Sequence, residues 1–242
     1  MVKDLLLLGA SAPEMDLLRA RIARMGYRVV PAKTPDQAHG LLRVGGTRIG
    51  AVIVPSELPT VDLRAALEAL RRLVPAHELS WLGAGRDPGS AGRERMRAAG
   101  VQLDLFDPID PHTLRFQVNR ALAGPKRIDG RRRTVRAPAD WPVTIRSGER
   151  RKEGRLYSVS ASGAFVAIDQ PSVARAEVAL DLTLPGASRL AVSGRVAMTN
   201  VPGNLARRSL PFGMGVQFEQ LSEAASVALL VYAQDRFRSL AL

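Results

Sequence analysis

The residues best suited to binding a ligand are arginines concentrated near the middle of the chain. Residues 126–155 carry 11 basic and 4 acidic side chains, whereas residues 1–124 carry 17 basic and 13 acidic ones. Much of the net charge of +12 therefore lies in one short stretch, which contains Arg131, Arg132 and Arg136. A guanidinium group can bind a pair of phosphate oxygens, or the O6/N7 edge of guanine, through two parallel hydrogen bonds. This concentration favours a local anion site over a broad nucleic-acid-binding face.

A second polar group follows the basic stretch, in the segment Ser158–Gly163 with the sequence SVSASG. Ser158 and Ser160 offer hydroxyl groups, and Gly163 lets another group approach the backbone closely because it has no Cβ atom. By composition alone, the segment is also typical of an ordinary turn between strands. A solvated hairpin turn is the expected role of the basic residues that precede it, Arg150, Arg151 and Lys152.

The first half of the chain alternates short apolar runs with amphipathic stretches. Strands are expected at residues 5–8, 27–30, 51–54, 79–82 and 101–106. Helices are expected after them at residues 14–25, 34–43, 63–74, 93–99 and 110–124. Five β–α repeats of this length predict an α/β domain over residues 1–124, with a doubly wound, five-stranded parallel sheet.

The order of these elements resembles the receiver domain of response regulators. In that family, acids after the first strand hold Mg²⁺, and an Asp at the end of the third strand accepts a phosphoryl group. Here Gly9-Ala10-Ser11 follows the first strand, Pro55 stands at the phosphoacceptor position, and Asp107 replaces a lysine. The resemblance therefore implies a degenerate receiver without phosphoryl-transfer chemistry, used for dimerisation or for docking a protein partner. A dinucleotide-binding domain is disfavoured, because the loop after the first strand does not match G-x-G-x-x-G.

The apolar pattern changes to a period of two after a basic connector at residues 125–140. Strands are expected at residues 143–145, 154–158, 164–168, 177–184, 190–198 and 213–218, followed by an amphipathic helix that begins at Ser222. Six short strands separated by turn residues predict a small antiparallel β-barrel with a C-terminal helix, over residues 141–242.

Three segments of this second half resemble the PilZ family. The family pattern R-x-x-x-R is present from Arg132 to Arg136, and the serine–glycine segment Ser158–Gly163 follows at the family's usual distance. The family's closing strand, G-x-G-V-x-F, is present as Gly213–Phe218 and is followed by the predicted helix. The order of the three segments, their spacing and the closing strand and helix all agree with the PilZ pattern over residues 127–240.

The resemblance implies a site for cyclic di-GMP, which PilZ domains bind. Carried over residue by residue, Arg132 and Arg136 grip phosphate and guanine, while Ser160 and Gly163 shape the barrel side of the site. Arg131 directly precedes the first motif arginine, and in this family an arginine at that place accompanies binding of a stacked ligand dimer.

One position departs from the PilZ pattern, because Ser158 stands where the family has Asp or Asn. A serine hydroxyl is shorter than either side chain and offers a single oxygen to the guanine edge. The lost hydrogen bond corresponds to about 1–3 kcal/mol. The substitution either abolishes nucleotide binding or is offset by the additional arginines, and the sequence leaves both outcomes open.

Composition excludes several other classes of protein. The chain has no cysteine, which rules out disulfides and thiol chemistry, and its three scattered histidines do not predict a zinc site. No apolar run is long enough to span a membrane, so the expected location is the cytoplasm. No carboxylate pair, nucleophile–base pair or metal cluster is apparent, so no enzyme and no cofactor is expected.

The leading interpretation is a non-enzymatic cyclic di-GMP effector in bacterial signalling, with an output in motility, surface polysaccharide or adhesion. The first alternative is a nucleotide-independent adaptor, in which the PilZ-like barrel and the pseudo-receiver both bind proteins. A nucleic-acid-binding protein that uses the basic stretch is the third interpretation. It is less favoured because aromatic residues do not interleave with the arginines.

Overall fold

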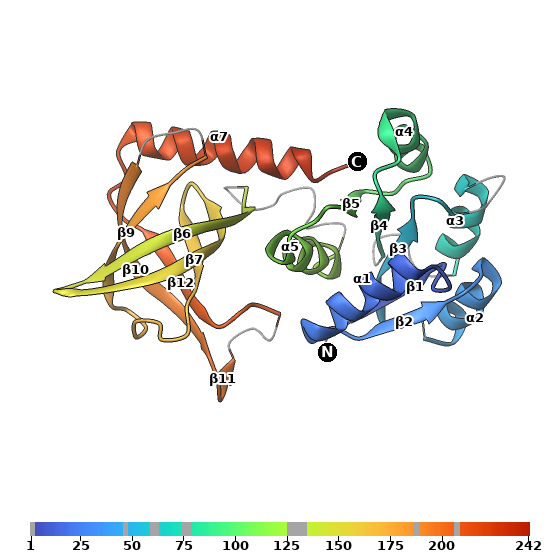
Figure 1. Ribbon diagram of the computed structural model, residues 1–242, viewed down its shortest axis with the longest axis horizontal. Coiled ribbons are helices and arrows are strands. Elements are labelled where there is room, and N and C mark those ends of the chain that lie inside the picture. Colours follow the sequence, from blue (N-terminus) through green and yellow to red (C-terminus); the bar gives the residue numbers. More distant parts are fainter. Residues whose placement is uncertain are drawn as a thin grey trace. The chain divides into compact units, whose positions relative to one another are not determined.

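The chain divides into two compact units in a computed structural model (Figure 1). Met1–Arg131 together with Leu240–Leu242 form the first unit, and Arg132–Ser239 form the second. The structure describes residues 3–45, 48–58, 63–73, 79–124, 135–185, 189–205 and 209–242.

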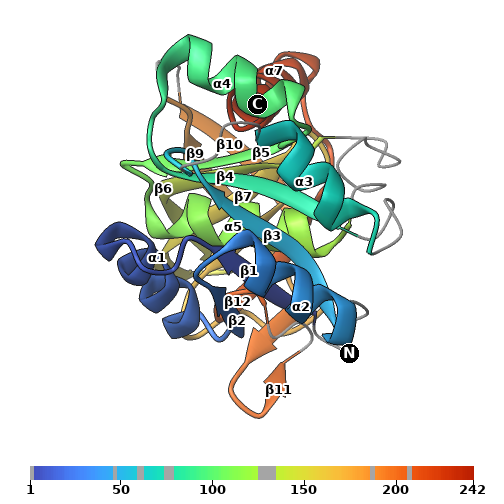
Figure 2. The ribbon, with the colours of Figure 1, turned by 90° about the vertical axis from the view of Figure 1, so that its right-hand side faces the viewer.

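The first unit contains a five-stranded parallel sheet with the strand order β2-β1-β3-β4-β5 (Figure 2). Its strands are β1 (Asp4–Leu8), β2 (Val29–Ala32), β3 (Ile49–Pro55), β4 (Ser80–Arg86) and β5 (Leu103–Asp107). Its helices are α1 (Pro13–Arg24), α2 (Pro35–Gly45), α3 (Leu63–Arg71), α4 (Gly89–Ala98) and α5 (Pro111–Leu122). The predicted doubly wound, five-stranded parallel sheet is confirmed.

Both faces of this sheet are buried, because alternate residues of each strand point to opposite sides. In β1, Leu5 and Leu7 belong to a core that also contains residues of α1 and α5. Leu6 and Leu8 belong to a second core, which includes residues of α2, α3 and α4. Figure 1 shows the same arrangement, with α1 and α5 on one face and the other three helices on the opposite face.

Two helices begin at the capping residues that the sequence indicates. The Asp110 carboxylate accepts a hydrogen bond from the Thr113 N–H (2.8 Å), and the Thr34 hydroxyl accepts one from the Gln37 N–H (3.2 Å). Helix α4 begins at Gly89, four residues before the expected start. Glycine is a poor helix former, so the glycines of this first turn do not predict a helix. A Cβ atom at Gly92 would lie 2.4 Å from the Cβ of Pro88. Close packing therefore requires the glycine in that turn.

Residues 240–242 extend the edge of the parallel sheet. Ala241 forms an antiparallel bridge with Leu103 of β5, and the Leu242 N–H donates to the Gln102 carbonyl (3.1 Å). The amide of Gln117, which is fully buried, donates to the carbonyls of Leu240 (2.7 Å) and Asp104 (3.1 Å). One side-chain amide thus holds the tail and the edge strand together.

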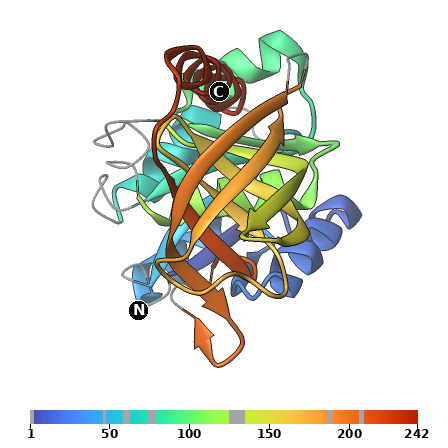
Figure 3. The same cartoon turned by 90° about the vertical axis from the view of Figure 1, so that its left-hand side faces the viewer.

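The second unit is a closed antiparallel barrel of six strands (Figure 3). Its strands are β6 (Ala137–Ser147), β7 (Arg150–Ser160), β8 (Gly163–Ala167), β9 (Glu177–Thr183), β10 (Arg189–Val201) and β12 (Gly213–Phe218). The hydrogen-bonded order is β10-β12-β8-β7-β6-β9, and pairing of β9 with β10 closes the barrel. A short strand, β11 (Asn204–Leu205), pairs with the end of β10.

Helix α7 (Glu223–Ser239) packs against the barrel. Its first turn is capped by the Ser222 hydroxyl, which accepts a hydrogen bond from the Ala225 N–H (3.2 Å). Leu229, which is fully buried, joins the barrel core made by the inward-facing residues of the strands. The predicted six-stranded barrel with a C-terminal helix is confirmed. Among the residues that the structure describes, no helix has the length and apolar character that a membrane span requires.

Candidate ligand site on the barrel

Arg136 and Ser158, two of the predicted site residues, are in contact. The Nη1 atom of Arg136 donates to the Ser158 hydroxyl (3.2 Å) and approaches the Ser158 carbonyl at 3.4 Å. The pairing of β6 with β7 explains the contact, because it places Pro138, two residues after Arg136, opposite Ser158. Strand register thus brings the end of the basic stretch to the serine–glycine segment.

The backbone around this contact is irregular on both strands. The register of β6 against β7 shifts between Pro138 and Trp141, and that of β7 against β8 shifts between Leu156 and Ser158. Such bulges redirect side chains and are common next to binding sites. Ser158 itself is only 3% exposed, so its hydroxyl faces partners within the protein more than bulk water.

Ser160 ends β7 and Gly163 begins β8, on either side of the turn that connects the two strands. The Ser160 hydroxyl donates to the Gly163 carbonyl (3.2 Å) and lies 3.4 Å from the Ser162 N–H. A Cβ atom at Gly163 would lie 2.5 Å from the carbonyl oxygen of Val216 on β12. Gly163 therefore permits close packing of β8 on β12, in addition to the ligand role that the sequence resemblance implies. Arg131 and Arg132 lie outside the described residues.

Three residues that the sequence analysis did not single out fix the start of β6 beside Ser158. Asp140, within the bulge, accepts from Arg155 at its carboxylate (2.7 Å) and at its carbonyl (3.0 Å). This hydrogen bond and ion pair with Asp140 raise the pKa of Arg155. On the other side, the Tyr232 hydroxyl of α7 donates to the Pro138 carbonyl (3.0 Å). No local pattern marks these residues, because each contact joins segments that are distant in the sequence.

The carboxyl end of the parallel sheet is the other place where a ligand is expected in an open α/β fold. Gly9, after β1, lies against Pro55 at the end of β3, and a Cβ atom at Gly9 would be 2.7 Å from Cγ of Pro55. The hydroxyl of Ser56, the next residue, donates to the Arg86 carbonyl (2.7 Å). Pro55 thus fills the space near the first strand with an apolar ring.

Two carboxylates near this end of the sheet, those of Asp87 and Asp107, are engaged by arginines. Asp107 forms an ion pair with Arg21 of α1 (3.4 Å). Asp87, after β4, receives two hydrogen bonds from Arg93 (3.0 Å each), and these hold its pKa below the usual range. Within the described part of the chain, no group of three His, Cys, Asp or Glu side chains is placed to hold a metal. The residues present therefore do not fit the Mg²⁺ ion of an active receiver.

We expect the first unit to resist phosphorylation by a small phosphoryl donor. Incubation with acetyl phosphate and Mg²⁺, followed by intact-mass measurement, should show no gain of a phosphoryl group, because Pro55 offers no nucleophile. A typical response regulator treated in parallel is the positive control. Stoichiometric phosphorylation of this chain would contradict the expectation, and peptide mapping would then identify the acceptor.

The first unit is thus a receiver-like α/β domain, and the second is a small antiparallel barrel. The barrel is a PilZ domain: the family model for the PilZ domain matches residues 130–233. The predicted PilZ domain is thereby confirmed. No curated protein matches the sequence.

Several solved structures are similar to parts of the chain. The Bacillus subtilis inhibitor of motility (MotI/DgrA) is 22% identical over 46% of this chain and 53% of that one, with a TM-score of 0.38. This chain therefore spans about half the length of that protein. A putative response regulator from Chloroflexus aurantiacus is 21% identical over 51% and 99% of the two chains (TM-score 0.44). A putative pilus assembly-related protein from Burkholderia pseudomallei is 24% identical over 50% and 90% (TM-score 0.43).

Proposed function

We propose that this protein is a non-enzymatic effector in bacterial signalling that responds to cyclic di-GMP through its PilZ domain. The observation that carries the proposal is the contact between Arg136 and Ser158. It joins the end of the arginine motif to the serine–glycine segment on the barrel, as one binding site requires. PilZ and receiver-like domains are generally regulatory domains without catalytic activity of their own.

The chemistry of the contact suits an anionic ligand. The guanidinium of Arg136 donates to the neutral hydroxyl of Ser158, which is an acceptor of modest strength. A phosphate oxygen would replace it with a charge-assisted hydrogen bond that is about twice as strong. Arg132 would supply a second guanidinium, and Arg131 a third that stabilises a stacked ligand dimer.

Ligand capture would be passed on to a protein partner. The receiver-like unit, with no phosphoacceptor at Pro55, is proposed as the docking surface for this partner or for a second copy of the chain. The proposed output is motility, surface polysaccharide or adhesion, and the proposed location is the cytoplasm. These assignments rest on the resemblance of the two domains to their families.

A nucleotide-independent adaptor is the second candidate, and Ser158 is the observation that favours it. Ser158 is nearly buried, and its hydroxyl already accepts a hydrogen bond from Arg136, which leaves one lone pair for the guanine edge. Loss of one hydrogen bond to a base costs about 1–3 kcal/mol, which can turn a micromolar ligand into one that does not bind at cellular concentrations.

Calorimetric titration of the full chain with cyclic di-GMP separates the two candidates. The effector proposal expects saturable heat at tens of micromolar ligand, and a stoichiometry of a ligand dimer per barrel if Arg131 acts as proposed. Absence of heat would overturn the effector proposal and leave the adaptor. A single ligand per barrel would overturn only the role of Arg131. A parallel titration with random duplex DNA tests the nucleic-acid alternative, for which steep salt dependence is the signature.

A further inference from the structure

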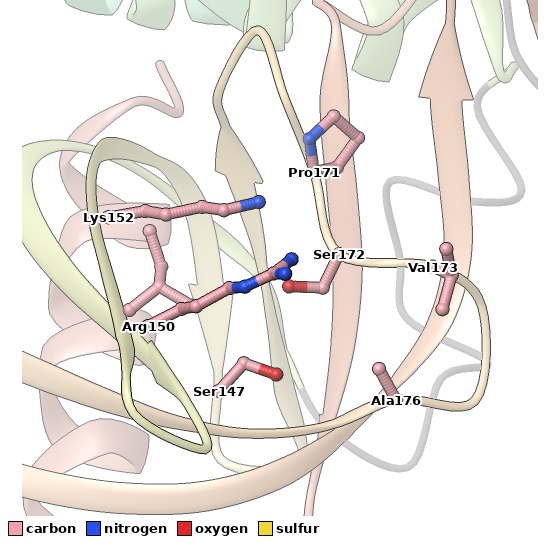
Figure 4. A pocket seen from close by; sticks show the side chains of 8 residues that line it. Ser147, Arg150, Lys152, Pro171, Ser172, Val173 and Ala176 are labelled. Carbon is pink, nitrogen blue, oxygen red and sulfur yellow. The ribbon is translucent and has the colours of Figure 1, made fainter.

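A cavity lies near the turn of the β6–β7 hairpin, at the opposite end of β7 from the proposed nucleotide site. It has a volume of about 200 Å³ and lies between this hairpin and the connection from β8 to β9 (Figure 4). The hairpin contributes Ile145, Ser147, Arg150 and Lys152, and the connection contributes Pro171, Ser172, Val173 and Ala176.

Two cations of β7 project into this cavity from the same face of the strand. Arg150 and Lys152 are two residues apart, so their side chains lie on one side of the pleat. Figure 4 shows both side chains extending toward the Pro171–Val173 segment, with the guanidinium next to the hydroxyl of Ser172. The arrangement places two positive charges and a hydroxyl around one space.

The hydrogen-bonding capacity of the two cations is largely unused. The Lys152 ammonium donates one hydrogen bond, to the Gln170 carbonyl (2.9 Å), and has two further N–H groups. The Arg150 guanidinium makes no hydrogen bond or ion pair within the described residues. Both cations therefore keep donors available for an anion in the cavity.

Neighbouring arginines on the same hairpin are neutralised by carboxylates, in contrast to Arg150. Arg146 pairs with Asp181 (2.8 Å), and Arg151 pairs with Glu153 (3.2 Å). Of the described residues that line the cavity, none is acidic. The described lining of the cavity therefore carries two positive charges and no negative one.

The wall opposite the hairpin is held in a defined shape. Arg175 adopts a left-handed backbone conformation (φ 70°), which is uncommon for a residue other than glycine. Its N–H donates to the Val196 carbonyl (2.7 Å) and thereby ties the connection to β10. Val173, 75% exposed, and Ala176 provide an apolar surface next to the cations. A fixed wall limits the ordering that a ligand would otherwise have to impose.

We propose that this cavity binds a phosphate monoester group. Its volume is below the range of about 300–1,000 Å³ that is usual for whole small-molecule ligands, so it suits one charged group with a small apolar neighbour. A phosphate monoester carries a charge of about −1.5 to −2 near neutral pH, which matches Arg150 and Lys152 together. Arginine binds its oxygens in a bidentate manner, while lysine acts as a point charge.

This site is separate from the nucleotide site. Both sites involve β7, but Lys152 and Ser158 are six residues apart, which corresponds to roughly 20 Å along an extended strand. The proposal therefore does not depend on the response to cyclic di-GMP. It assigns a role to two basic residues that the sequence alone places in a solvated hairpin turn.

The test is a titration of the full chain with phenyl phosphate and with inorganic phosphate, followed by NMR of the backbone amides. We expect saturable shifts confined to residues near 145–152 and 170–176. Arg150→Gln and Lys152→Gln should each weaken binding by roughly tenfold, because each removes one charge-assisted contact. Arg151→Gln is the matched control, since that arginine is adjacent but paired with Glu153, and it should leave the affinity unchanged.

Further arms of the same experiment define the ligand class. Benzoate, a monoanion with the same ring, should bind more weakly than phenyl phosphate if a dianion is preferred. Binding of phenyl phosphate should weaken below about pH 6, where the phosphate takes up its second proton. Equal binding of benzoate would overturn the assignment to phosphate. An equal effect of Arg151→Gln, or shifts at residues 158–163 in place of the cavity, would overturn the site itself.

Discussion

Replacement of Arg136 by alanine should lower the affinity for cyclic di-GMP by at least roughly a hundredfold. Hydrogen bonds to a charged group contribute about 1.5–3 kcal/mol each, and a bidentate guanidinium makes two of them. Each 1.4 kcal/mol is a factor of about ten in the dissociation constant. Calorimetry of the wild-type chain and of Arg136→Ala measures this difference directly.

Two further variants show whether the loss is specific. Arg136→Lys keeps the charge but not the planar pair of donors, so it should bind with intermediate affinity. Arg151→Ala, which removes a barrel arginine paired with Glu153, should bind like the wild type. Far-UV circular dichroism during heating controls for unfolding, since Arg136 also contacts the buried Ser158. Equal affinities for wild type and a folded Arg136→Ala variant would remove this arginine from the site.

Substitution of Ser158 by asparagine should raise the affinity for cyclic di-GMP by roughly ten- to a hundredfold. The longer amide offers both a carbonyl and an NH₂ group, so it can hydrogen-bond the guanine edge where the hydroxyl is too short. The gain corresponds to about 1–3 kcal/mol for a partly buried hydrogen bond. Its carbonyl can also accept the hydrogen bond that Arg136 now donates to Ser158.

The control for this gain is the same substitution nearby. Ser162, in the exposed β7–β8 turn, can be changed to asparagine without altering the position that the PilZ pattern specifies. Ser162→Asn should leave the titration unchanged. A folded Ser158→Asn chain that binds no better than the wild type would show that this position does not limit affinity. If the wild type binds no ligand and Ser158→Asn does, the serine is the cause of the loss.

Most of the fold can be predicted from the sequence, because burial sets the spacing of apolar residues in each helix and strand. Residues 51–54 are apolar without interruption and form a strand that is buried on both faces, whereas β9 alternates and buries only Val178, Leu180 and Leu182. Capping residues such as Asp110 locate helix starts through local hydrogen bonds. The first turn of α4 is missed because its glycines lower helix propensity, although tight packing on Pro88 selects one of them.

The candidate sites are harder to predict from the sequence, because their residues come into contact from segments that are distant in the chain. The motif spacing predicts that Arg136 and Ser158 belong to one site, but only the register of β6 and β7 brings them into contact. Arg150 and Lys152 resemble any solvated pair of basic residues until the β8–β9 connection is placed opposite them. In both cases the deciding information is a pairing between distant segments, which composition and period do not contain.

The pairing of Ala241 with Leu103 means that the chain returns to the first unit after it has formed the barrel. Because residues 240–242 belong to the first unit, the barrel is inserted in the sequence between α5 and the residues that form the antiparallel bridge to β5. The chain consequently crosses between the units twice, and α7 leads directly into the second crossing. The barrel is thus joined to the first unit at both ends of its sequence. The edge strand β5 is covered by residues that lie more than a hundred positions later in the sequence.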